Sequence, residues 1–103
     1  MRKGEIWWAR LGTPAGRRPV LLLSRDEAYA VRTAVTVAPL TTTMRGIPVE
    51  IHLDESEGVP RKCAINLDSI LTIPIVYLEE RITRLSPAKL DDVHRALIFA
   101  LDL

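Results

Sequence analysis

The chain has 103 residues, which is enough for one domain and too few for two, so we expect a single domain over residues 1–103. Its composition, 48% hydrophobic and 26% charged, excludes a disordered or collagen-like chain. The longest aliphatic run, residues 20–23, is far shorter than the roughly 18 residues of a membrane span, and Gly4 and Glu5 interrupt the start of any signal peptide. A lone Cys63 can form no intrachain disulfide, so we expect a reduced, cytoplasmic protein with no membrane contact.

The net charge of +1 hides an uneven distribution along the chain. Residues 1–48 contain eight cations and three anions, a balance of +5, whereas residues 49–103 contain six cations and ten anions, a balance of −4. This segregation would allow a basic surface for a polyanion. The alternative is that the two halves intermingle in space and their charges average out. The charge pattern alone favours neither.

Three strands are predicted in the first half of the chain, separated by turn residues. The first covers residues 5–11 and ends at a Gly- and Pro-containing segment. The second, residues 19–24, is almost entirely aliphatic, which predicts burial on both faces of a sheet. The third, residues 34–38, is expected to stop at Pro39, which cannot donate to a ladder.

Three more strands are predicted in the second half. Over residues 49–53 apolar residues alternate with Glu50 and His52, so the apolar face should point inward and these two side chains outward. Residues 63–71 are predicted to form one strand and residues 76–82 another.

The chain ends in a predicted amphipathic helix. Ser86 can cap it, Pro87 suits its first position, and Leu90, Val93, Leu97 and Leu101 recur at helical spacing. Five or six short strands and a closing helix predict a mainly β protein with some α structure. We expect a small, strongly bent antiparallel barrel, because flat sheets of such strands would leave exposed edges.

The usual motifs of catalysis are missing. The sequence has no HExxH, CxxC, nucleophile elbow or phosphate-binding GxxxxGK[ST] loop, and it offers no metal site. We interpret His52, on the outward face of a strand, and His94, beside the apolar stripe of the helix, as structural or solvated residues. A histidine acting as general acid or base stays an open alternative.

Two segments are rich in side chains that bind phosphate. Arg17 and Arg18 lie between Gly16 and Pro19 at a loop-to-strand junction, where a fixed guanidinium would present a fork matched to a phosphate. Residues 39–46 follow a strand and carry three hydroxyls and an arginine, which can donate several hydrogen bonds to an anion. Each segment alone is compatible with ordinary turn chemistry and solvated arginines, but together they favour anion binding.

Adjacent tryptophans mark the first strand. Successive strand residues point to opposite faces, so Trp7 and Trp8 cannot enter the same core. One is expected to pack inside, and the other either stacks on an unpaired base, contacts a partner or covers a barrel end.

An ordered set of motifs resembles the MazF/PemK/Kid toxins of bacterial toxin–antitoxin modules. The resemblance covers nearly the whole chain in the family order. Its motifs are RKGEIWW at residues 2–8, GRRPVLLLS at 16–24, VAPLTT at 37–42, AINLDSI at 64–70 and RLS at 84–86.

The resemblance implies an SH3-like (CcdB/PemK-type) barrel that works as a homodimer. It also implies a sequence-selective endoribonuclease, or mRNA interferase, that cuts single-stranded RNA without metal or cofactor and leaves a 2′,3′-cyclic phosphate and a 5′-hydroxyl. The partner would be an antitoxin whose acidic tail covers the active surface. The family's catalytic arginine and hydroxyl map to Arg18 and Thr41. We expect the RNA-binding residues to be Arg17, Thr42, Thr43, Arg45 and Asn66.

Two departures from the family pattern concern acidic residues. The first loop is short and lacks a glutamate that many relatives carry before the arginine pair, and Arg10 stands where many have an acidic residue. Cleavage specificity is therefore not transferable from relatives. A second reading is a degenerate, non-cleaving RNA-binding module on an SH3-like barrel. A third is a gyrase-poison-like toxin, although that class ends in Trp-Gly-Ile and this chain ends in Leu101-Asp102-Leu103.

Overall fold

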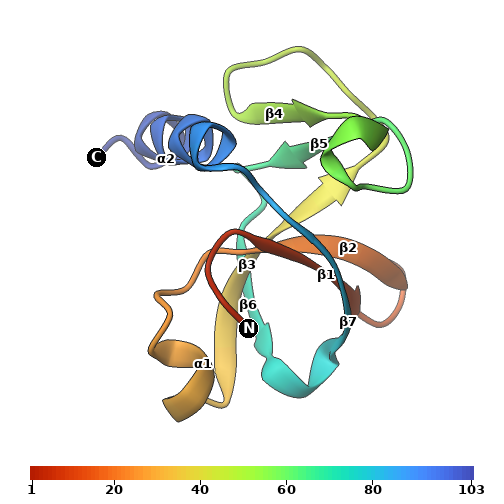
Figure 1. The fold of residues 1–103 in the computed structure, drawn as a ribbon, viewed down its shortest axis with the longest axis vertical. Helices are drawn as coiled ribbons and strands as arrows, with labels where there is room; N and C mark the ends of the chain where they lie inside the picture. The colour runs from red at the N-terminus through yellow and green to blue at the C-terminus, as the bar shows by residue number, and fades with distance from the viewer.

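The computed structural model describes residues 1–103 and contains one seven-stranded sheet, two α-helices and two short 3₁₀ helices (Figure 1). The elements are, in chain order, β1 (Glu5–Arg10), β2 (Arg17–Leu22), α1 (Ala28–Val31), β3 (Ala34–Thr41), β4 (Glu50–Leu53), η1 (Glu55–Glu57), β5 (Cys63–Asn66), β6 (Leu71–Pro74), η2 (Ile75–Tyr77), β7 (Leu78–Arg84) and α2 (Pro87–Leu101).

The sheet is antiparallel and bends at β3. Its strand order is β4-β5-β3-β2-β1-β7, and β6 pairs with the first half of β3. The end of β3 leaves β2 and pairs with β5, through Leu40 opposite Ile65 and Thr41 opposite Ala64. In Figure 1 β4 and β5 accordingly lie apart from β1, β2 and β7, with β3 running between the two groups. The predicted mainly β fold, a bent antiparallel sheet closed by a C-terminal helix, is confirmed.

Two hydrophobic clusters occupy opposite faces of the central strands. The larger one packs beneath α2, and the smaller one lies among β1, β2, β3, β6 and the start of β7. Along β2, Leu21 belongs to the larger cluster whereas Val20 and Leu22 belong to the smaller, and all three are fully buried. The prediction that this aliphatic strand is buried on both faces is therefore confirmed.

Several predicted strand boundaries were wrong: β2 covers Arg17–Leu22 instead of 19–24, and β7 covers Leu78–Arg84 instead of 76–82. β3 continues through Pro39 to Thr41, because a change of pairing partner at this point lets a residue without an N–H remain in the strand. Residues 63–71 form not one strand but two, β5 and the start of β6, separated by a turn. The sheet consequently has seven strands instead of five or six.

The predicted orientation of Glu50 was also wrong. Val49 and Leu53 are buried and His52 is exposed, as the alternation indicates, but only 2% of the Glu50 side chain is exposed. Its Oε1 accepts hydrogen bonds from the backbone N–H groups of Arg45 and Gly46 at 2.9 and 3.0 Å. Glu50 thus faces the loop that precedes its own strand and ties that loop down.

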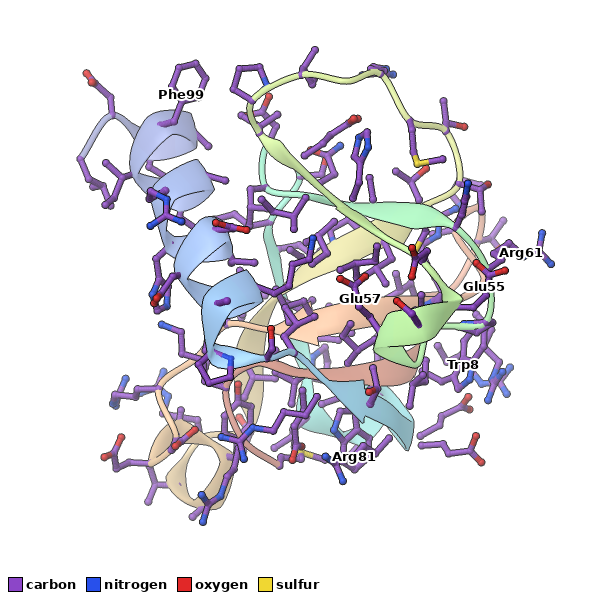
Figure 2. All side chains as sticks on the ribbon, turned by 45° about the horizontal axis from the view of Figure 1, so that its top comes forward. Trp8, Glu55, Glu57, Arg61, Arg81 and Phe99 are labelled. Atoms are coloured by element: carbon purple, nitrogen blue, oxygen red, sulfur yellow. The ribbon has the colours of Figure 1, made fainter.

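Helix α2 begins as predicted. The Ser86 Oγ accepts a hydrogen bond from the Lys89 N–H at 3.1 Å, and Pro87 is the first helical residue. Val93 and Ala96 are buried beneath the helix, whereas Phe99 near its end is exposed (Figure 2). Neither helix has the length and hydrophobicity required to cross a lipid bilayer.

Candidate functional site: an arginine and threonine pocket

A pocket of about 320 Å³ opens where the ends of β2 and β3 separate. It is lined by Trp8, Arg17, Arg18, Pro19, Leu40, Thr41, Thr42, Thr43, Pro60, Arg61 and Cys63. The first arginine pair and the three threonines, which lie far apart in the sequence, therefore meet in one hollow.

Two prolines explain why the pocket forms at this point. The β2–β3 ladder runs from Leu22 opposite Val37 to Val20 opposite Pro39 and then ends. Neither Pro39 nor Pro19, the next residue along β2, has an N–H to continue it. Beyond this point β3 pairs with β5, so the ends of β2 and β3 diverge and leave space between them.

Arg18 lies inside a strand and is half-buried. Arg18 is opposite Ala9 of β1, so its backbone is fixed by the sheet and does not belong to a loop. The predicted strand began one residue too late to include it. Arg18 forms no ion pair and no side-chain hydrogen bond, although it lines the pocket with Thr41. Its guanidinium is thus free to bind an anion.

Thr41 is the last residue of β3. If the β2–β3 register continued by two more residues, Thr41 would be opposite Arg18, and side chains at opposite positions share one face of a sheet. The Thr41 Oγ1 accepts a hydrogen bond from the Thr43 N–H at 3.1 Å. This bond orients the hydroxyl and leaves its own proton available for a ligand in the pocket.

Arg17 has partners that Arg18 lacks. Its Nε donates to the Glu79 Oε1 at 2.8 Å, and its guanidinium carbon lies 4.3 Å from the centre of the Trp8 ring. Arg10 donates to the other Glu79 oxygen at 3.0 Å. The hydrogen bond from Arg17, supported by Arg10, lowers the pKa of Glu79. Glu79 is therefore ionised near neutrality and is a poor general base.

The other predicted RNA-binding residues divide into two groups. Thr42 and Thr43 are exposed and line the pocket. Arg45 and Asn66 do not line it: the Arg45 N–H is bound to Glu50, and the Asn66 Oδ1 accepts from the Asp68 N–H at 3.0 Å. Their role in RNA binding stays a prediction.

The two adjacent tryptophans have different surroundings. Trp7 packs against the smaller hydrophobic cluster and donates its indole N–H to the Glu5 Oε1 at 2.9 Å. Trp8 lines the pocket, and Figure 2 shows it on the same side of the molecule as Arg61. Both rings are half-buried.

Sequence reasoning missed Pro60, Arg61, Cys63 and Glu79 at or beside the site. Residues 60–63 reach the pocket only because β5 pairs with the end of β3, a long-range contact that no local pattern predicts. Burial raises the pKa of the Cys63 thiol, which makes it a weak nucleophile.

No carboxylate or imidazole lines the pocket. His52 lies at a separate pocket with Lys62 and Lys89, and the buried His94 Nε2 has no hydrogen-bond partner. No group of three or more His, Cys, Asp or Glu residues lies close enough to hold a metal ion. The chemistry that the lining offers is anion binding and hydrogen-bond donation.

Comparison with known proteins identifies relatives over almost the whole chain. Residues 2–101 match the family model described as PemK-like, MazF-like toxin of type II toxin-antitoxin system. Among curated relatives, the probable endoribonuclease MazF2 of Mycobacterium tuberculosis is 46% identical over 98 residues, which cover 94% of each chain. The probable endoribonuclease MazF5 of the same species is 40% identical over 101 residues, covering 97% of this chain and 92% of that protein.

Solved structures agree with these sequence relatives. The Mycobacterium tuberculosis toxin MazF-mt6 matches with a TM-score of 0.89 and 34% identity, over 96% of this chain and 97% of that chain. A mycobacterial endoribonuclease in complex with its cognate antitoxin matches with a TM-score of 0.90 and 27% identity, over 100% of this chain and 96% of that chain.

Proposed function

Because the chain belongs to the PemK-like, MazF-like toxins of type II toxin–antitoxin systems, we propose that it cuts single-stranded RNA in the pocket formed by Arg18 and Thr41. The observation that carries this proposal is the meeting of an unpaired, strand-fixed guanidinium with an oriented hydroxyl in one open hollow. Curated relatives named endoribonuclease support the activity itself.

The reaction is a transesterification within the RNA. The 2′-oxygen of the nucleotide attacks the adjacent phosphorus, a new O2′–P bond forms, and the P–O5′ bond breaks. The 2′-hydroxyl loses its proton and the departing 5′-oxygen gains one, so the products are a 2′,3′-cyclic phosphate and a 5′-hydroxyl. No metal or cofactor takes part in this scheme.

Arg18 and Thr41 act on the charge that develops in the transition state. The Arg18 guanidinium binds two phosphoryl oxygens as they become more negative, and the Thr41 hydroxyl donates a further hydrogen bond. Neither group accepts the proton of the 2′-hydroxyl, because a guanidinium stays protonated and a threonine hydroxyl is a poor acceptor. Catalysis by these two residues is therefore electrostatic.

The family also implies partners. We propose a homodimer that acts in the cytoplasm and a cognate antitoxin that occupies the Arg18–Thr41 pocket. One solved relative is a mycobacterial endoribonuclease with its antitoxin, and an acidic, flexible antitoxin segment would complement the unpaired arginines of the pocket.

The test is a cleavage assay with purified protein, EDTA and a long single-stranded RNA. Arg18→Ala should lower the cleavage rate by about 10²–10³-fold, because it removes a donor aimed at the developing charge. Arg32→Ala removes an exposed arginine outside the pocket and should leave the rate unchanged. Full activity of Arg18→Ala would reject this site, and intact RNA with the unmodified protein would favour the non-cleaving module.

A further inference from the structure

Arg10 and Arg17 are directly opposite each other in the β1–β2 ladder, and Glu79 lies between their side chains. Like charges at opposite positions repel, so an unassisted pair would destabilise the sheet. Glu79 Oε2 accepts from Arg10 and Oε1 from Arg17, at 3.0 and 2.8 Å. One carboxylate thus holds both guanidinium groups.

A β-bulge supplies this carboxylate. In the β1–β7 ladder Trp8 is opposite Glu80 and Ala9 is opposite Leu78, which leaves Glu79 without a partner on β1. Bulges change the direction of a side chain and often occur beside functional sites. The extra residue lets the Glu79 carboxylate reach past β1 to Arg17 on β2.

The guanidinium group of Arg17 consequently has a partner at one of its edges and another on one of its faces. Glu79 binds its Nε edge, and the guanidinium lies over the Trp8 ring. Arg17 and Trp8 both line the pocket, and bases stack on arginine planes as they do on aromatic rings.

The neighbouring arginine is held differently. Arg18 has no ion pair and can bind a phosphate, whereas the charge of Arg17 is offset by Glu79. Consecutive arginines of one motif therefore differ in what they can recognise: the first is arranged for stacking and the second for an anion.

We propose that Glu79 is a positioning residue that determines specificity: it holds Arg17 flat on Trp8 as a stacking surface for the base next to the scissile phosphate, and keeps Arg10 and Arg17 off the RNA backbone. This proposal rests on the proposed function of the pocket. If Glu79 served only to balance charge in the sheet, its loss would weaken stability and leave base preference unchanged.

The first experiment needs no RNA. In a Trp7→Phe background, Trp8 is the only tryptophan, so acrylamide quenching of its fluorescence reports the exposure of this ring. Glu79→Gln should release Arg17 and about double the quenching constant, because one ring face is uncovered. Glu80→Gln removes the same charge from the next residue, which forms no ion pair, and should not change it. Equal quenching in all three proteins would overturn the proposal.

The second experiment measures selectivity. A long RNA is digested and the cut ends are sequenced. Stacking gives a modest preference for the bases that stack most strongly, so Glu79→Gln should weaken this preference, by at most roughly tenfold, and create additional cut sites. Arg17→Lys keeps the charge but lacks the planar surface, so it should relax selectivity in the same way even if Glu79→Gln folds poorly. Unchanged cut sites in both variants would overturn the proposal.

The third experiment measures RNA binding, which should become stronger in the variant that loses selectivity. A mixed-sequence 2′-O-methyl RNA, which cannot undergo attack by its 2′-oxygen, should bind Glu79→Gln more tightly at low salt than it binds the unmodified protein. The slope of log affinity against log salt should steepen by about 0.7 for each arginine released to a phosphate. Weaker binding with an unchanged slope would contradict the proposal.

Failure of the unmodified protein to cut RNA would reject the proposed function instead. The quenching experiment would still report whether Glu79 holds Arg17 against Trp8.

Discussion

Single hydrogen bonds decide what each residue of the pocket can do. Arg17 and Arg18 are adjacent and chemically identical, yet Glu79 and Trp8 engage only the first. In the same way, Thr41, Thr42 and Thr43 all line the pocket, but only the Thr41 hydroxyl is oriented by a backbone N–H. The resemblance to known toxins assigned Arg18 and Thr41 as the catalytic pair, and the structure adds a physical reason for singling out these two.

Thr41 can be tested by separating its hydroxyl from its shape. Thr41→Val keeps the branched side chain but loses the oxygen, so we expect the cleavage rate to fall by about 10²-fold, the usual loss on removing a donor to a developing charge. Thr41→Ser restores the oxygen and should recover most of the rate. The measurement is single-turnover cleavage at saturating enzyme. A Thr41→Ser rate as low as that of Thr41→Val would contradict this assignment, because restoring the hydroxyl would then not restore the activity.

Among the helices and strands, the sequence predicted those features that depend on interactions between residues close together in the chain. The aliphatic run of β2, the cap of α2 and its buried stripe follow from periodicity and capping chemistry, and the structure contains them. The path of β3 through Pro39 could not be predicted, because it depends on β5 replacing β2 as the pairing partner. For the same reason Arg61 and Glu79 carried no sequence signal: a long-range pairing positions the first and a bulge the second.

The 42–49 loop between β3 and β4 depends on Glu50, which leads to a prediction about pH. The Arg45 backbone N–H, with Gly46 and His52, holds the pKa of Glu50 below its ordinary value of 4.5. A lowered folded-state pKa means that the carboxylate stabilises the fold above pH 4.5 and that this contribution is lost as the pH falls through the folded value.

Glu50→Gln should therefore be less stable than the unmodified protein at pH 6, and the gap should narrow at pH 3.5. Urea unfolding at both pH values measures it. Glu80→Gln removes an exposed carboxylate with no ion pair and should leave the unfolding midpoint at pH 6 unchanged. A gap for Glu50→Gln that widens on acidification would show that the carboxylate does not anchor the loop.

Across the whole molecule, the two charged halves of the sequence are partly interleaved. Glu79 from the acidic half pairs with Arg10 and Arg17, and Glu5 from the basic half pairs with Arg81 at 3.5 Å. At these ion pairs the charges of the two halves do offset each other, which is the alternative that the charge pattern of the sequence left open. Within the pocket Arg17 is paired in this way, but Arg18 and Arg61, which come from different halves of the sequence, form no ion pair. The pocket thus presents two unpaired guanidinium groups to a polyanion, although the net charge of the chain is only +1.

The two unpaired arginines make the salt dependence of RNA binding a test of this arrangement. Two unpaired arginines contacting two phosphates predict a slope of about −1.4 for log affinity against log salt, since each contact with a single strand contributes about −0.7. Arg61→Ala should therefore weaken binding of a 2′-O-methyl RNA at low salt and reduce the slope by about 0.7. The single-turnover rate at saturating enzyme should stay close to that of the unmodified protein, because the proposed function places Arg18 and not Arg61 at the scissile phosphate. A slope that Arg61→Ala leaves unchanged would mean that the RNA backbone does not cross the pocket on the side of residues 60–63.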